Sequence, residues 1–242
     1  MDSSSSSERD TVVVHGMLVP EGHPSLSPFC LKLETFLTLT KIPYVRSKEF
    51  AKSSKGKVPW ISYNGEEVAD SQFCIEFVKS KFGVDLNRGL STEQRAVAHA
   101  FRIMMDEFHF WCNAYFRFYE LDDPVFVKFF PPAELRQQVL DRYAQLLPAQ
   151  GIGRHSEAEV LALFTANLQA AQDYLGEKAF MMGDSPTEVD CSVFAFLAVL
   201  IFYTPRQFER QMGKNYVQEK LPKLFEYFLR MKQLTYPDYS SC

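Results

Sequence analysis

Cysteine is scarce in this sequence, and its spacing fits neither a metal site nor a disulfide framework. Five cysteines occur among 242 residues, without a Cys-x-x-Cys pair and without histidines at the spacing typical of zinc ligands. Their odd number and their scatter favour reduced thiols in a reducing compartment, which we expect to be the cytosol. The same scatter predicts no metal site.

Long apolar runs and excess positive charge are also lacking. The longest apolar run covers residues 191–203 and is shorter than the ~20 residues that a membrane-spanning helix requires, so it predicts a buried core helix and no transmembrane segment. The formal net charge is -4, and no basic tract rises above a mild cluster at residues 48–57, which disfavours nucleic acid as a partner. The serine-rich residues 1–10 have no apolar stretch behind a basic flank, so they predict a disordered tail and not a secretory signal.

Hydrophobic residues are abundant, at 46%, and a chain of this length can bury the core of one large domain or of two small ones. Before residue 83 the order strand, helix, strand, hairpin, helix predicts a mixed sheet with helices packed against it. Asn64-Gly65 predicts the hairpin turn, because both central residues of that turn need a positive φ. The expected elements are strands at 11–19, 43–46, 58–63 and 67–69 and helices at 27–40 and 71–82.

Beyond a short polar linker, residues 84–91, nearly every segment has the spacing of a helix. We expect an all-α domain over residues 92–235 and a tail at 236–242. Thr187 and Asp190 predict a capped helix start, in which a threonine and an acid three residues later satisfy free N–H groups. The helix that follows is apolar on nearly every face, as is typical of a central helix. The expected helices cover 92–119, 131–147, 156–175, 187–202 and 221–234.

Several motifs carry a resemblance to a known family. They are Ser27-Pro28-Phe29-Cys30 at the start of the first helix, Val58-Pro59 before a strand, Asp70-Ser71 at the start of the next helix, and GDSPTEVDCSVFAFLA in the second half. Together they resemble the cytosolic glutathione transferases. The stretches SPFCLKLETFL, GKVPWISYNGEEVADSQFCIEF, FHFWCNAYFRF and AQGIGRHSEAEV look most like the failed axon connections/metaxin-related branch of that superfamily.

The resemblance implies a glutathione-transferase-like fold, with an α/β thioredoxin-like N-terminal domain (βαβ-ββα) at residues 11–83 and an all-α C-terminal domain. It also implies glutathione as co-substrate, no metal and a homodimer. The implied activity is that of a glutathione transferase acting on a small hydrophobic electrophile. The alternative is a non-catalytic adaptor or binding protein, because the branch includes trafficking and developmental proteins and a shared fold does not secure catalysis.

Ser27 is the expected catalytic residue. The first N–H groups of a helix lack partners and carry partial positive charge, so a thiolate beside them is stabilised, and a serine hydroxyl there can donate a hydrogen bond to the sulfur. The alternative is that Ser27 only caps the helix ahead of Pro28. Cys30, one turn into the helix, is expected to be a packed core thiol, and a serine in the first position excludes a dithiol cycle. Ser25 is the second choice for the activating hydroxyl.

The other expected glutathione contacts come from the resemblance. Pro59 is cis in the family, and the backbone of Val58 would pair with the cysteinyl part of glutathione, while Lys57 would reach the glycyl carboxylate. Ser71 offers a hydroxyl and a backbone N–H at a helix start to the γ-glutamyl carboxylate, and Asp70 would take the ammonium group. Asp70 and Ser71 also fit a helix cap, and the two roles are compatible.

An apolar stripe runs from residue 101 to residue 118. Such a stripe is usually core, but apolar side chains here occupy more than one face, and the second face could line a hydrophobic acceptor pocket. His109 and Arg117 would be its polar exceptions. Arg154 and His155, ahead of the next helix, fit a structural pairing or a ligand contact equally well. The expected pocket residues are Met104, Met105, Phe108, Trp111 and Tyr115.

Overall fold

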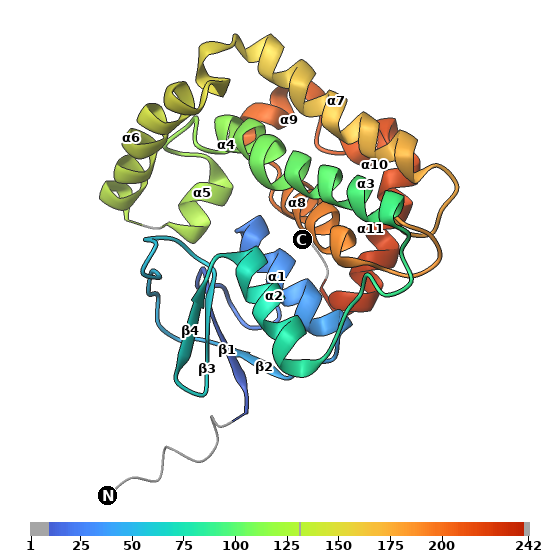
Figure 1. Ribbon diagram of the computed structural model, residues 1–242. Coiled ribbons are helices and arrows are strands. Elements are labelled where there is room, and N and C mark those ends of the chain that lie inside the picture. The colour runs from blue at the N-terminus through green and yellow to red at the C-terminus, as the bar shows by residue number, and fades with distance from the viewer. Residues whose placement is uncertain (1–9, 131, 240–242) are drawn as a thin grey trace, which may run out of the picture.

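A four-stranded mixed sheet and two helices form the first half of the molecule (Figure 1). The computed structural model describes residues 10–130 and 132–239. The strand order is β2-β1-β3-β4, with β1 parallel to β2 and antiparallel to β3. This arrangement confirms the predicted strand–helix–strand unit followed by a hairpin and a helix. The elements are β1 (Val12–His15), α1 (Pro28–Leu39), β2 (Tyr44–Arg46), β3 (Trp60–Tyr63), β4 (Glu66–Ala69) and α2 (Ser71–Phe82).

Buried and partly exposed residues alternate along β1, so its side chains divide between the two faces of the sheet. Val14 of β1 and Ile61 of β3 are buried in one apolar cluster with residues of α1 and α2. The hairpin turn has the expected backbone, because Asn64 and Gly65 have φ values of 49° and 86°. β1 ends at His15, earlier than the predicted strand, and a loop then leads to α1.

The second half is helical, as predicted. The long helix expected at 92–119 is present as an unbroken helical run over residues 92–117, but its middle turn, η1, is π-helical, with hydrogen bonds that reach one residue further than those of an α-helix. Three short helices, α5, α9 and α10, were not predicted; Asp123 caps α5 by accepting from Val125 N and Phe126 N. The helices are α3 (Thr92–Ile103), η1 (Met104–His109), α4 (Phe110–Arg117), α5 (Pro124–Phe129), α6 (Ala133–Gln150), η2 (Ile152–Arg154), α7 (Glu157–Leu175), α8 (Glu188–Phe202), α9 (Arg206–Met212), α10 (Tyr216–Lys220) and α11 (Pro222–Thr235).

Helix α8 lies at the centre of the helical half, and its start confirms the predicted cap (Figure 1). The Asp190 carboxylate accepts hydrogen bonds from Thr187 N, Thr187 Oγ1 and Met181 N. Residues 188–200 are all buried, as expected of a central helix. Across the described residues no single helix has the length and hydropathy to cross a membrane, and only α8 joined to α9 and α10, bent by 85°, meets that test as a pair.

The two halves of the molecule share their cores. Leu31 of α1 is fully buried in the apolar cluster of the helical half, and Cys191 of α8 is fully buried in the cluster of the sheet half. Helix α1 packs along α8, so it lies between the sheet and the other helices (Figure 1). The linker at 84–91 therefore joins two segments of chain that are packed against each other.

The end of the described chain is packed, unlike the tail expected at 236–242. The Tyr236 hydroxyl donates to Glu34 Oε2 at 2.9 Å. The Tyr239 ring lies edge-on to the His23 ring, with centroids 5.4 Å apart. This segment thus covers part of α1 and the loop before it. The rest of both predicted tails lies outside the described residues.

Candidate functional site

Ser27 is the N-cap of α1, as the sequence predicts. Its backbone is extended, with φ -84° and ψ 118°, and its Oγ accepts a hydrogen bond from Cys30 N at 3.4 Å. Pro28 takes the first helical position, where a missing N–H has no consequence. Oγ is the acceptor in the capping bond, and the same hydroxyl lies within hydrogen-bond reach of the Cys30 thiol. Ser27 is partly exposed, so the cap and the activating role are compatible.

Cys30 and Ser25 lack the exposure that a reacting group needs. Cys30 is 1% exposed, and burial raises the pKa of its thiol to about 11. A Cβ at Gly16 would lie 3.1 Å from Cys30 Sγ, so the sulfur is packed against the backbone that follows β1. Ser25 is also 1% exposed, and its Oγ accepts from Ser27 N at 3.2 Å. Cys30 is therefore a packed thiol, and Ser25 holds the backbone of Ser27.

The Val58–Pro59 peptide bond is cis, as the resemblance implies. Pro59 is buried and Val58 is partly exposed, directly before β3. Pro59 O accepts a hydrogen bond from Asp70 N at 3.3 Å. The β3–β4 hairpin thus brings the two predicted motifs into direct contact.

Asp70 and Ser71 form the start of α2, with Asp70 as the N-cap. Asp70 Oδ1 accepts from Gln72 N at 2.9 Å. Asp70 has φ 89° and ψ 132°, a conformation that is rare for a residue with a side chain. Such backbone strain costs roughly 1–3 kcal/mol and is found mostly at functional sites. Ser71 is 5% exposed, so its N–H and hydroxyl lie just beneath the surface.

Lys55 and Lys57 both lie on the loop before Pro59, and the structure distinguishes them. Lys57, the expected contact for a carboxylate, is exposed, and its backbone closes a turn with Ser53. Lys55 Nζ donates to Ala69 O at 3.3 Å and lies 4.5 Å from the centroid of the Phe73 ring. Lys55, for which the sequence carried no prediction, is therefore the lysine that contacts the start of α2.

The π-helical turn η1 between α3 and α4 carries three of the five residues expected in the acceptor pocket, and not all of them are accessible. Met105 has no exposed surface and belongs to the core, so it offers nothing to a substrate. Phe110 contacts Phe29 of α1, with ring centroids 5.0 Å apart, which brings α4 to the first turn after Ser27. The other predicted pocket residues are partly buried at the edge of the core: Met104, Phe108, Trp111 and Tyr115.

His109 and Arg117 are buried and do not face a pocket. The His109 ring stacks on Phe164 at 4.3 Å, neither of its nitrogens has a hydrogen-bond partner among the described residues, and burial lowers its pKa to about 3. Arg117 donates from NH2 to Val199 O and Tyr203 O near the end of α8. A cation there is stabilised by the negative end of the helix dipole. The expectation that these two residues are polar points in a pocket is therefore wrong.

Arg154 and His155 make contacts within the connection between α6 and α7. Arg154 Nε donates to Pro148 O at 3.2 Å, and His155 Nδ1 lies 3.9 Å from Glu159 Oε2. A Cβ at Gly153 would lie 2.7 Å from backbone atoms of α6, so this turn is tightly packed. These contacts favour the structural interpretation of the two residues.

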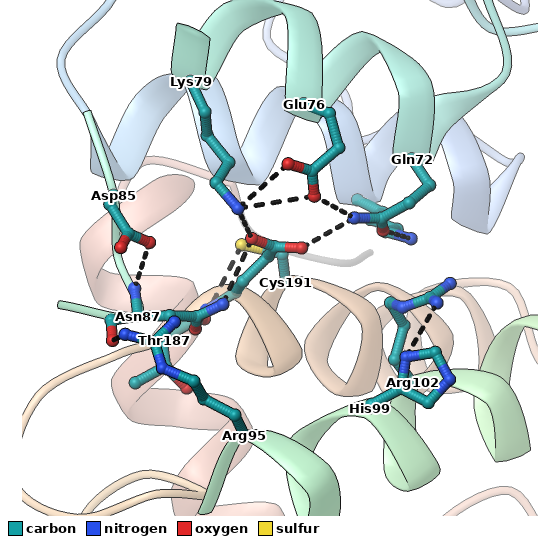
Figure 2. A network of polar contacts seen from close by, with 12 residues as sticks. Gln72, Glu76, Lys79, Asp85, Asn87, Arg95, His99, Arg102, Thr187 and Cys191 are labelled. Atoms are coloured by element: carbon teal, nitrogen blue, oxygen red, sulfur yellow. Dashed lines mark hydrogen bonds and ion pairs between the residues drawn. The ribbon is translucent and has the colours of Figure 1, made fainter. Parts of the chain in front are cut away.

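A polar cavity of about 260 Å³ lies between α2, α3 and the start of α8 (Figure 2). Glu188, with a side chain 8% exposed, accepts there from Gln72 Nε2 at 2.7 Å, Lys79 Nζ at 2.8 Å and Asn87 Nδ2 at 3.3 Å. The network ties α2 and the linker to α8. Within the described residues, no group of three or more His, Cys, Asp or Glu side chains is arranged to hold a metal ion.

Two family models match the chain, the glutathione S-transferase N-terminal domain over residues 28–124 and the C-terminal domain over residues 164–231. The isoprene-epoxide–glutathione S-transferase of Rhodococcus sp. strain AD45 is 31% identical over 92% of this chain and 98% of its own length. The chain belongs to the glutathione S-transferase superfamily. Failed axon connections of Drosophila melanogaster is 32% identical over 96% of this chain and 60% of its own length. Metaxin-3 of Xenopus laevis is 26% identical over 74% of this chain and 63% of its own length. The chain therefore spans less than two thirds of the length of Failed axon connections and of Metaxin-3.

Solved structures of glutathione S-transferases agree with the fold. Rice GST1 in complex with glutathione superimposes with a TM-score of 0.61 at 15% identity, covering 96% of this chain and 92% of its own. At that identity the likeness concerns the fold alone. The predicted fold and the predicted relationship to the failed axon connections and metaxin proteins are both confirmed.

Sequence reasoning missed Lys32 and its partner Gln72, which lie beside the predicted motifs of this member of the superfamily. Lys32 Nζ, fully buried on α1, donates to Gln72 Oε1 of α2 at 2.8 Å. The available signal was a single lysine between Leu31 and Leu33 in an apolar helical stretch. A charged residue at an apolar position of a helix has a buried partner more often than not, and that partner cannot be identified from the sequence.

Proposed function

We propose that the protein is a glutathione transferase in which Ser27 activates the thiol of glutathione for attack on a small hydrophobic electrophile. The observation that carries the proposal is the position of Ser27. Ser27 is partly exposed at the cap of α1, where its hydroxyl can turn from the Cys30 thiol to donate to the sulfur of a bound glutathione, whereas Cys30 is buried with its pKa raised to about 11. The N-terminus of α1 adds partial positive charge beside that sulfur.

The required stabilisation is within reach of this arrangement. Lowering a thiol pKa from about 8.5 to near 6.5 corresponds to about 2.7 kcal/mol. A hydrogen bond to a charged group contributes roughly 1.5–3 kcal/mol, and a helix terminus adds about 0.3–1 kcal/mol. No further base is needed, because Ser27 donates a hydrogen bond and does not react.

We assign the rest of glutathione to the motifs that the family resemblance implies. The backbone of Val58, before Pro59, would pair with the cysteinyl residue. Ser71 would hold the γ-glutamyl carboxylate at the start of α2, and Asp70 has its second carboxylate oxygen left for the ammonium group, since Oδ1 accepts from Gln72 N. Lys57, together with Lys55 from the same loop, would attract the glycyl carboxylate. Family membership supports glutathione as the co-substrate.

The electrophile would bind where α4 meets the first turn of α1. Phe29 and Phe110, in contact there, extend the apolar surface of Met104, Phe108, Trp111 and Tyr115. The name of the Rhodococcus relative specifies an isoprene epoxide, so a small alkyl epoxide is the first electrophile to try on this chain. We further propose a homodimer, on family resemblance, and a cytosolic location, which the four free cysteines among the described residues support.

Calorimetry with glutathione tests the binding step. We expect millimolar or tighter binding by the natural protein and loss of the signal in Ser71→Ala, because the γ-glutamyl carboxylate would lose its hydroxyl partner. Conjugation of 1-chloro-2,4-dinitrobenzene and of a small alkyl epoxide then tests the reaction. Binding that persists unchanged in Ser71→Ala would contradict the assigned orientation of the tripeptide.

A second candidate is a non-catalytic adaptor or binding protein. The similarity to Failed axon connections favours it, because that name specifies no reaction and the relative is 32% identical over nearly the whole chain. The small exposure of Ser71 favours it as well. A folded protein that gives no calorimetric signal with millimolar glutathione would exclude the transferase and leave this candidate.

A further inference from the structure

Lys32 is a fully buried cation on the second turn of α1. Its neighbours Leu31 and Leu33 are fully buried as well. Its ammonium group donates to Asp106 Oδ2 at 2.6 Å and to Gln72 Oε1 at 2.8 Å. A buried charge is tolerated when it is paired and hydrogen-bonded, and both conditions are met here.

The three elements that meet at this ammonium each carry one part of the proposed site. Helix α1 begins behind Ser27. Helix α2 carries Ser71, the direct neighbour of Gln72. The π-helical turn η1 holds Asp106 between the two pocket residues Met104 and Phe108. One side chain therefore connects the thiol end of the glutathione site, its γ-glutamyl end and the acceptor pocket.

Both partners of Lys32 are oriented by further contacts. Gln72 Nε2 donates to Glu188 Oε1 at 2.7 Å and to Glu76 Oε1 at 3.0 Å, and Figure 2 shows Gln72 pointing from α2 into this network. Asp106 is 5% exposed, and its Oδ2 also lies 3.5 Å from Arg102 NH1. Rotation of either side chain would break a hydrogen bond inside the protein, so the position of one element constrains the other two.

Stability by itself does not account for a buried ion pair of this kind. Apolar residues of similar volume often replace such pairs with no loss of stability, because removing two charges from water offsets their attraction. What an apolar pair cannot supply is direction, since hydrogen bonds fix the orientation of Gln72 and Asp106 and dispersion contacts do not.

We propose that Lys32 is a positioning residue that holds the two glutathione-binding helix starts in register with the acceptor pocket. The inference rests on the proposed transferase function. The ammonium group sets the spacing between Ser27 and Ser71. When an electrophile binds, a movement of η1 is transmitted through Asp106 and Lys32 to the starts of α1 and α2. Glutathione affinity and the occupancy of the acceptor pocket are thereby coupled.

Three variants separate positioning from stability. Lys32→Met leaves the buried Asp106 with only its longer contact to Arg102, whereas Lys32→Met/Asp106→Leu replaces both members of the Lys32–Asp106 pair by apolar groups. Lys81→Met is the control, because Lys81 lies on α2, one of the helices that Lys32 joins, and pairs with a carboxylate, that of Glu66, at the surface. Urea unfolding and calorimetric glutathione binding are measured on each full-length variant, and KM for glutathione and kcat are measured at saturating electrophile.

We expect Lys32→Met to lower the urea midpoint and to weaken glutathione binding by about tenfold. The double variant should recover the midpoint but keep the weaker binding, and KM for glutathione should rise more than kcat falls. Lys81→Met should stay within about twofold of the natural protein in binding. Natural affinity in a stable double variant would overturn the inference, because Lys32 would then be structural only.

Two further observations keep the test decisive. If the double variant fails to fold, Gln72→Met at its half-exposed position removes one acceptor of Lys32, and it should still weaken glutathione binding. Unchanged affinity in Gln72→Met would overturn the inference. If the natural protein does not bind glutathione, the proposed function fails and this inference fails with it. If the natural protein binds glutathione and the double variant binds it equally well, this inference alone fails.

Discussion

Ser27 and Cys30 stand three residues apart at the start of one helix, and their surroundings give them opposite chemistry. Ser27 lies at the partly exposed cap, where the positive end of the helix dipole stabilises an incoming anion. Cys30 lies one turn further, buried, so its thiolate is disfavoured and its pKa is raised to about 11. A thiol that stays protonated at neutral pH is a poor nucleophile.

Substitution of each residue should therefore have a different effect on conjugation. Ser27→Ala should lower kcat/KM for an aryl halide by about 100-fold, since about 2.7 kcal/mol of thiolate stabilisation is at stake. Cys30→Ala should leave kcat/KM nearly unchanged and reduce stability. Steady-state kinetics over a range of pH checks both, with the apparent thiol pKa rising only in Ser27→Ala. An inactive Cys30→Ala variant together with a fully active Ser27→Ala variant would contradict the assignment of Ser27 as the activating residue.

His109 is a second residue whose burial decides its chemistry. Burial lowers its pKa from the ordinary 6.5 to about 3, so the folded protein keeps the ring neutral while the unfolded chain takes up a proton below pH 6.5. Stability from this residue is therefore present above pH 6.5 and is lost as the pH falls toward 3. At pH 5 the loss amounts to about 2 kcal/mol.

The variant His109→Phe should remove this acid sensitivity. Phenylalanine can keep the stacking on Phe164 and has no nitrogen to leave unpaired. We expect the difference in free energy of unfolding between pH 7 and pH 5 to shrink by about 2 kcal/mol, measured by urea unfolding at both values. A pH dependence equal to that of the natural protein would show that His109 is protonated or hydrated in the folded state.

At the scale of elements, helix starts and helix interruptions behave differently. The starts of α1, α2 and α8 are set by side chains within three residues of each cap, and all three were predicted. The interruption at η1 has no such local signal, because residues 104–109 have ordinary helix-forming composition. The packing of Met105 and His109 into the core, with Asp106 turned to Lys32, accompanies the π-helical turn.

The cap of α8 offers a test at this scale. Thr187→Ala removes the hydroxyl that donates to Asp190 Oδ2 at 2.8 Å, while the two backbone donors to Asp190 remain. We expect the free energy of unfolding to fall by about 1 kcal/mol. Thr235→Ala is the control, because its hydroxyl donates to Met231 O within the last turn of α11 and caps no free N–H group, so its loss should change stability by less than about 0.5 kcal/mol. Equal effects in the two variants would refute a special role for the α8 cap.

At the scale of the whole molecule, the two halves do not have separate cores. Leu31 from the first half lies in the apolar cluster of the second, and Cys191 from the second lies in that of the first. The ion pair between Lys32 and Asp106 crosses the same junction. Loss of either half would expose apolar surface and an unpaired charge, so the halves should unfold together.

The two tryptophans allow this cooperativity to be measured. Trp60 lies in β3 and Trp111 in α4, so Trp60→Phe and Trp111→Phe each leave one fluorescent reporter in one half. We expect coincident urea transitions for the two reporters. Leu31→Ala in either background should shift both by the same amount, at a cost of about 2–5 kcal/mol. Transitions that separate in Leu31→Ala would show that the halves are independent.

The sequence by itself determined the order of elements in the sheet half, the hairpin turn and the starts of α1, α2 and α8. Asn64-Gly65, the Ser27 cap and the Thr187–Asp190 pair act through neighbours only a few residues away, so their chemistry can be read along the chain. The motifs at Val58-Pro59 and Asp70-Ser71 were visible in the same way, through the family that they resemble.

Only the tertiary structure decided which of these side chains are exposed and what each one contacts. Burial separates Cys30 from Ser27, and it removes Met105 from the expected pocket. Lys32 is paired with Asp106, which lies 74 residues away in the chain. Burial and pairing depend on segments that meet only when the chain is folded, because the packing of distant elements sets the local dielectric and the available partners. The reactivity of the candidate site therefore follows from the way α1, α2 and α4 come together.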